Sequence, residues 1–184
     1  MKKGLKRLVL LFVLLVGVLA LTGCEEDPTK GFKNPKTIEY KTEKGTIQLT
    51  YDDDGTYEVE TNDPYVVLKN KENNFRIDMD YSNNTVEQQN TSKENFKKDK
   101  NYTITDNLEY RHYKGYAMTQ NEYTTTNVYL IFDEENNIIS NIKVSPVMTS
   151  TATDELAKGK KPVDVLFNQE KVQQILKTVK YVKE

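Results

Sequence analysis

The sequence predicts an α+β fold: an antiparallel β-sheet with a short inserted helix and a C-terminal helix packed on it. Apolar and polar residues alternate over much of residues 37–144, and a period of two is typical of half-buried strands. A polar stretch at residues 82–100 interrupts this alternation and carries a helix-capping pattern. Near the C-terminus, apolar residues recur at helical spacing instead. Strands combined with one inserted and one terminal helix predict this architecture.

The first strands are predicted from Thr37 onward, where Ile38 and Tyr40 alternate with polar residues. Asp52–Gly55 is predicted to form a hairpin turn, because aspartate tolerates turn geometry and glycine supplies a positive φ. The strand that follows runs through Val59. The clearest alternation comes next, where Phe75, Ile77, Met79 and Tyr81 alternate with Arg76, Asp78 and Asp80.

The inserted helix is predicted to begin at Thr91, because Thr91 and Glu94 have the spacing of a capping box, and to bury Phe96. Strand signals return at residues 102–105, 108–118, 123–132 and 138–144. Val128–Phe132 is apolar on both faces, which predicts a central strand covered on both sides. Residues 148–161 indicate a loop with a weak helix. In the terminal helix Asn168 is the expected N-cap, and Val172, Ile175, Leu176 and Val179 form the apolar face.

Composition excludes several classes of protein. The chain has 184 residues with one cysteine and one histidine, so it has neither a disulfide framework nor the ligands of a cysteine/histidine zinc site. With the four basic residues of the first 23 set aside, 22 basic and 28 acidic residues remain, a formal charge of −6. This acidity argues against a nucleic-acid partner. The sequence predicts no metal and no cofactor.

The N-terminus has the organisation of an export signal. Residues 1–7 are basic, Leu8–Leu21 is apolar, and Leu21-Thr22-Gly23-Cys24 follows. A helix of fourteen residues rises only about 21 Å, which is less than the roughly 30 Å of a bilayer core. This segment resembles a bacterial lipoprotein signal with the lipobox that signal peptidase II reads. The resemblance implies cleavage between Gly23 and Cys24, a diacylglyceryl thioether on Cys24, and a lipid-anchored protein on the extracytoplasmic side of the cell membrane.

Three regions follow from this organisation. Residues 1–23 are the predicted signal peptide, residues 24–36 are the lipidated cysteine and a tether, and residues 37–184 are one domain. The tether holds two prolines, one glycine and a single large apolar side chain, so we expect it to be flexible. Stretched out, it is on the order of 35 Å long. The sequence therefore predicts a domain held clear of the lipid headgroups.

The predicted domain resembles the PsbP-like family, which includes photosynthetic lumenal proteins and small bacterial lipoproteins. The segments that carry the resemblance are residues 45–59, Asn74–Asp78, the helix near Phe96, Tyr113–Tyr116, Tyr129–Phe132 with the turn at Asn136-Asn137, and Ile175–Val179. The tryptophan common early in photosynthetic members is absent, which argues against a photosystem role. The resemblance implies a fold and a docking habit, with no catalytic residue to carry over.

Candidate chemistry is sparse. His112 is the single histidine and no nucleophile elbow accompanies it, so the sequence favours a protein that is not an enzyme.

The acids of Asp52–Asp54 are consecutive, which differs from the alternate spacing of an EF-hand loop, and a solvated turn is the preferred interpretation over a calcium site. Asp78 and Asp80 share a strand face and could serve a carboxylate-dependent hydrolase. With Arg76 on that face, an exposed charge ladder is the preferred interpretation.

An aromatic cluster is the main candidate for binding. Tyr110, His112, Tyr113, Tyr116 and Tyr123 lie within fourteen positions, and tyrosine suits recognition because it offers contact area together with a hydroxyl. Plain sheet packing is the alternative, since half of the residues of a strand face inward. The predicted function is a non-catalytic binding or adaptor domain for an envelope protein. The alternatives are a calcium or small-ligand receptor and, less favoured, the hydrolase.

Overall fold

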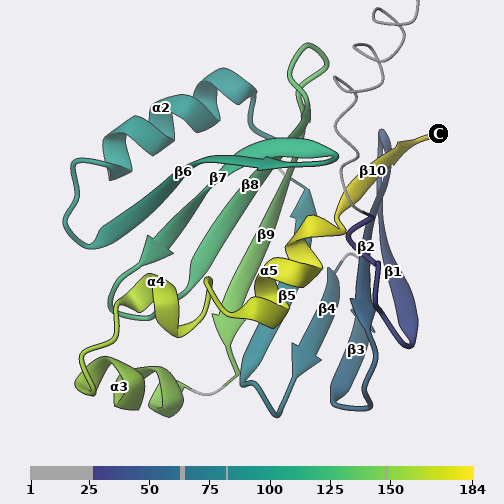
Figure 1. Ribbon diagram of the computed structural model, residues 1–184. Helices are drawn as coiled ribbons and strands as arrows, with labels where there is room; N and C mark the ends of the chain where they lie inside the picture. The colour runs from purple at the N-terminus through teal and green to yellow at the C-terminus, as the bar shows by residue number, and fades with distance from the viewer. Residues whose placement is uncertain (1–26, 63–64, 82, 148) are drawn as a thin grey trace, which may run out of the picture.

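The computed structural model describes residues 27–184 except 63–64, 82 and 148, and Figure 1 shows two antiparallel sheets with short helices. The α+β class and the antiparallel pairing are confirmed, but the strands form two sheets and not the single one predicted. The larger sheet has the order β3-β4-β5-β9-β8-β7-β6. Its strands are β3 Tyr57–Asn62, β4 Tyr65–Asn70, β5 Phe75–Tyr81, β6 Tyr102–Tyr110, β7 Tyr113–Gln120, β8 Thr126–Asp133 and β9 Ile138–Pro146.

The smaller sheet joins the two ends of the domain. It has the order β1-β2-β10, with β1 Pro35–Thr42, β2 Gly45–Asp52 and β10 Lys180–Lys183. The predicted hairpin turn at Asp52–Gly55 is therefore wrong, because β2 pairs with β1 and β10 while the next strand, β3, pairs with β4. The four residues carry the chain from one sheet to the other. Alternation identifies strands locally, but it does not state which strands pair.

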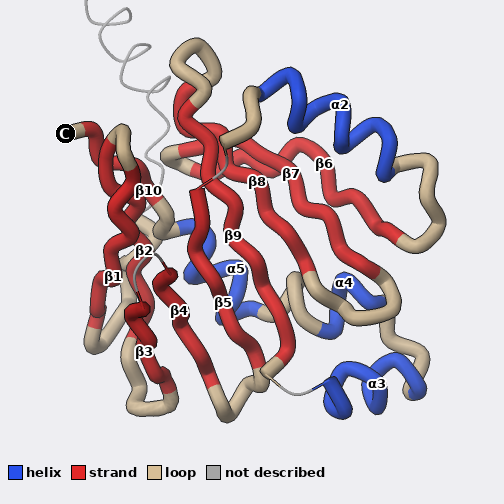
Figure 2. Tube along the Cα trace, turned by 180° about the vertical axis from the view of Figure 1, so that it is seen from behind, coloured by secondary structure: helices blue, strands red, loops and turns tan. Residues whose placement is uncertain are grey.

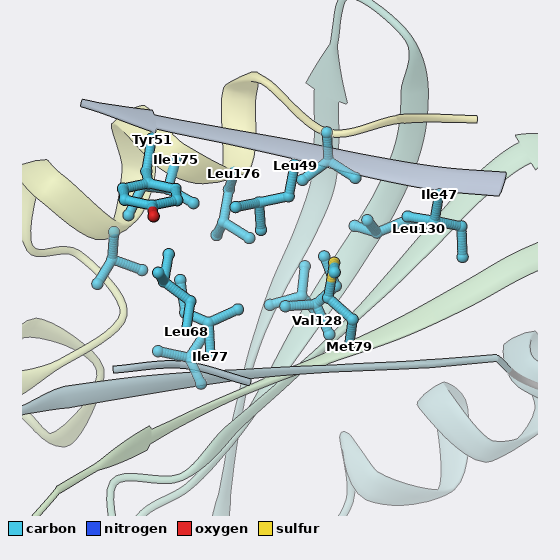
Figure 3. Packing of buried hydrophobic residues seen from close by; sticks show 14 of the residues in the cluster. Ile47, Leu49, Tyr51, Leu68, Ile77, Met79, Val128, Leu130, Ile175 and Leu176 are labelled. Atoms are coloured by element: carbon cyan, nitrogen blue, oxygen red, sulfur yellow. The ribbon is translucent and has the colours of Figure 1, made fainter. Parts of the chain in front are cut away.

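The hydrophobic core lies between the two sheets (Figure 3). One face of β2 supplies Ile47, Leu49 and Tyr51, and the facing side of the larger sheet supplies Leu68, Ile77, Met79, Val128 and Leu130. Ile175 and Leu176 of helix α5 close the space beside the small sheet. The predicted strand Val128–Phe132 lies in β8, an interior strand in which Val128 and Leu130 are buried on one face while Tyr129 and Ile131 are half-buried on the other.

Four helices accompany the sheets within the described residues: α2 Val86–Phe96, α3 Thr149–Ala157, α4 Pro162–Val165 and α5 Glu170–Lys177. The inserted helix α2 exists, but its predicted start is wrong, because the capping box is formed by Thr85 and Gln88. Thr91 lies inside the helix, and Phe96 is half-buried against the ring of Tyr102. In α5 the N-cap is Gln169 and not Asn168, whose side chain donates to Asp164 instead.

The two faces of the larger sheet are covered unequally. Helix α5 belongs to the core side, and α2 crosses the opposite side near β6 and β7. Figure 2 shows this opposite side, where no helix lies in front of β3, β4 or β5. Within the residues that the structure describes, no helix is long and apolar enough to cross a membrane. The predicted signal peptide, Gly23 and Cys24 all lie outside the described residues.

Candidate functional site

The tyrosines of β7 point to opposite sides of the sheet. Tyr113 is 4% exposed and lies in the core, where its hydroxyl donates to the carbonyl of Leu176 at 2.5 Å. Tyr116 is 2% exposed on the other side, where its hydroxyl donates to the carbonyl of Gln89 in α2 at 2.9 Å. Burial raises the pKa of both hydroxyls, so both stay protonated. Sheet packing accounts for these two residues.

Of the other three members of the aromatic cluster, only Tyr110 lies beside another member, with its ring centre 4.9 Å from that of Tyr113. Tyr123 is 51% exposed in the turn after β7, whereas His112 is exposed in the turn before it. Tyr110 is half-buried, and its hydroxyl donates to Oε1 of Gln173 at 2.9 Å. The five residues thus occupy two faces and two ends of the sheet. They do not form one binding surface. Tyr110 instead lines a groove with residues outside the predicted cluster.

Tyr110 lines an open groove of about 860 Å³. The groove lies between the N-terminal segment Asp27–Gly31, the β6–β7 hairpin and α5, and Arg111 lies on its rim at the hairpin. Its charged residues are Asp27, Lys30, Glu109, Arg111, Glu170 and Lys177. Amide side chains of α5, among them Gln173 and Gln174, line the same space. The groove therefore presents both signs of charge, amide donors and acceptors, and one aromatic ring.

Hydrogen bonds hold the N-terminal segment that forms one wall of the groove. The carboxylate of Asp27 accepts the backbone N–H and the hydroxyl of Thr29, which closes a local turn. The Thr29 N–H is the largest cause of the lowered pKa of Asp27, and the nearby Arg111 charge lowers it further. Downstream, Oδ1 of Asp52 accepts the backbone N–H groups of Lys33 and Asn34 at 2.9 and 2.7 Å. The described part of the expected flexible tether is thus fastened to the domain.

The acids considered for calcium binding each serve a local contact. Asp52 holds the N-terminal segment, Asp53 pairs with Lys36 at 2.5 Å, and Asp54 pairs with Lys171 at 2.8 Å. The Lys171 contact lowers the pKa of Asp54 to about 2, with help from the Thr56 hydroxyl. Across the described part of the chain, no group of three or more His, Cys, Asp or Glu side chains could hold a metal ion.

The carboxylates considered for hydrolysis lie on the open face of the larger sheet. Asp78 accepts from Nε of Arg76 at 2.7 Å, and the neighbouring Asp80 is exposed. In the register of the sheet Asp78 lies opposite Lys143. This arrangement agrees with the charge ladder that the sequence favours over a hydrolase site, and neither acid lines the groove beside Tyr110. Core side chains fill the space beneath Val128 and Leu130, which leaves no room there for the small ligand of the alternative function (Figure 3).

Sequence reasoning missed most of the groove. Its walls come from residues 27–31, 109–111 and 168–177, which are far apart in the chain, so no spacing marks them. Of the residues that line the groove, the sequence identifies only Tyr110 as a candidate for binding.

Comparison with protein-family models finds no matching family, and no curated protein and no solved structure matches this chain.

Proposed function

We propose that the chain is a lipid-anchored extracytoplasmic binding domain that engages a protein of the cell envelope and catalyses no reaction. The groove beside Tyr110 is the observation that carries this proposal. It is open, large enough for several side chains, and lined by charges of both signs and by amides. Such a lining matches the polar and charged surface of a folded protein partner better than an apolar small molecule.

The anchoring rests on the N-terminal sequence. Lipidation of Cys24 and residence at the cell membrane are expected from the lipobox, Leu21-Thr22-Gly23-Cys24. An anchored domain searches two dimensions, which raises its effective concentration and makes a modest affinity sufficient.

We also propose that the domain has the PsbP-like variant of the α+β fold. The inserted helix between β5 and β6 and the terminal helix α5 support it, and superposition on a structure of that family tests it.

Site-specific photo-crosslinking in cells tests the binding function. A photoreactive residue replaces Gln174, which is exposed in the groove, and in a second strain it replaces Glu122, which is exposed at the other end of β7. We expect a discrete adduct from position 174 and none from position 122. Mass spectrometry of the adduct identifies the partner.

Charge reversal provides the matched control. Arg111→Glu with Lys177→Glu inverts two cations of the groove, while Lys98→Glu with Lys100→Glu makes the same charge change at exposed positions between α2 and β6. The adduct should disappear in the first double variant and persist in the second. An adduct that both variants retain, or identical capture from positions 174 and 122, would contradict a function for the groove, and calcium and small ligands would then be the next ligands to test.

A further inference from the structure

The structure shows where the chain enters the domain. Asp27 lies at the groove, together with Arg111 of the β6–β7 hairpin. From there the segment runs to Lys33 and Asn34, which are fastened to Asp52. The point of entry is therefore fixed at the end of the larger sheet that carries the β6–β7 turn.

The remaining connection to the predicted anchor is short. Asp27 is three positions after Cys24 in the sequence, and three steps of a fully extended chain span at most about 11 Å. This reach is about one third of the length expected for a free tether over residues 24–36. It is comparable to the roughly 8 Å screening length of physiological salt, so a lipidated Cys24 would keep the entry point close to the lipid headgroups.

We propose that the β6–β7 end of the domain is apposed to the bilayer, with the turn that holds His112 facing the headgroups. This inference rests on the proposed lipidation of Cys24. The turn at Glu122 lies at the other end of the eight-residue strand β7, roughly 25 Å away, and in this orientation it points away from the membrane. A protein bound in the groove then lies at the level of the headgroups.

The short connection, rather than net charge, sets this orientation. The groove beside the entry point has three cations, Lys30, Arg111 and Lys177, and three anions, Asp27, Glu109 and Glu170. The charges of the groove balance, and the two further acids of the connection, Glu25 and Glu26, do not favour an anionic surface, so charge does not draw this end to the membrane. The same orientation is therefore expected on vesicles with and without anionic lipid.

Fluorescence quenching on vesicles tests the orientation. Cys24 is the only cysteine of the chain and its thiol is consumed by lipidation, so one introduced cysteine takes up a dye specifically. Full lipidated protein carrying His112→Cys or Glu122→Cys is labelled and placed in phosphatidylcholine vesicles, with or without a minority of phosphatidylglycerol. Both positions are exposed turns, which makes them a matched pair. Lipids with a spin label on the headgroup should quench the dye at 112 several-fold more than the dye at 122.

The possible results separate two failures. Equal quenching at the two positions, or stronger quenching at 122, overturns the proposed orientation and leaves the anchor intact. Mass spectrometry of the same samples reports the acyl chains on Cys24. A protein that lacks them and does not float with the vesicles overturns the anchoring in the proposed function, and the orientation with it.

Discussion

Helices α2 and α5 cover opposite faces of the same sheet by different means. Three side chains of α5, Val172, Ile175 and Leu176, are buried in the core. The one buried side chain of α2 is polar, Gln89, and it meets the hydroxyl of Tyr116. Apolar burial stabilises the whole domain, whereas a single hydrogen bond contributes only about 1 kcal/mol. We therefore expect α5 to unfold only with the domain and α2 to open separately.

Charged contacts complete the attachment of α2. Lys93 and Lys97 donate to the two carboxylate oxygens of Asp106 in β6, at 3.0 and 2.6 Å. The Lys93 ammonium also lies 5.2 Å from the centre of the Tyr116 ring. The Lys97 contact, followed by that of Lys93, lowers the pKa of Asp106 to about 2 against the cost of desolvation. The helix thus depends on a charge that acid removes.

The largest effect is expected from the apolar helix. Leu176→Ala removes a fully buried side chain and leaves a cavity, which should lower the free energy of unfolding by about 2–5 kcal/mol. Urea unfolding followed by circular dichroism measures the loss. Gln174→Ala, at an exposed position of the same helix, should change stability by less than about 0.5 kcal/mol. Equal losses in the two variants would show that α5 is not held by apolar burial.

A smaller effect is expected at the start of α2. Thr85→Ala removes the side chain that accepts the Gln88 N–H and should destabilise the helix by about 1 kcal/mol. Hydrogen exchange of the α2 amides should accelerate while exchange of the α5 amides does not. The matched variant is Thr91→Ala, an exposed threonine inside the helix, which should leave exchange unchanged or slow it. Faster exchange in Thr91→Ala and not in Thr85→Ala would support a helix that begins at Thr91, as the sequence predicts.

These two threonines illustrate how far the sequence reaches. Both Thr85-x-x-Gln88 and Thr91-x-x-Glu94 match a capping box, and the pattern alone does not rank them. The structure selects the first, because the helix already includes Val86. The backbone N–H of Val86 donates to Oδ1 of Asn137 at 3.2 Å. That contact joins residues 51 positions apart, so no local pattern contains it.

The same limit applies to the sheets and to the groove. Alternation predicted strands such as β5 correctly, since facing the core every second residue is a local property. The separation of β2 from β3 depends on pairing with β10 at the other end of the chain. For the tyrosines, an odd separation between Tyr113 and Tyr116 already places them on opposite faces of a strand. The odd spacing in the sequence is therefore evidence that these two tyrosines do not share one surface.

The smallest effect is a pH response confined to α2. The folded-state pKa of Asp106, about 2, lies below the roughly 3.9 of an unfolded aspartate, so its contribution is complete above about pH 4 and is lost as the pH falls toward 2. Asp54 has a similar pKa and pairs with Lys171 of α5, so acid weakens a contact of both helices. Because α5 also has its buried apolar face, hydrogen exchange between pH 4 and pH 2, corrected for the intrinsic rate, should accelerate for α2 amides and not for α5 amides. In Asp106→Asn the corrected exchange of α2 should already be fast at pH 4 and should change much less between pH 4 and pH 2 than in the unsubstituted protein. A response of equal size in α5 would mean that charge, and not apolar burial, also holds the terminal helix.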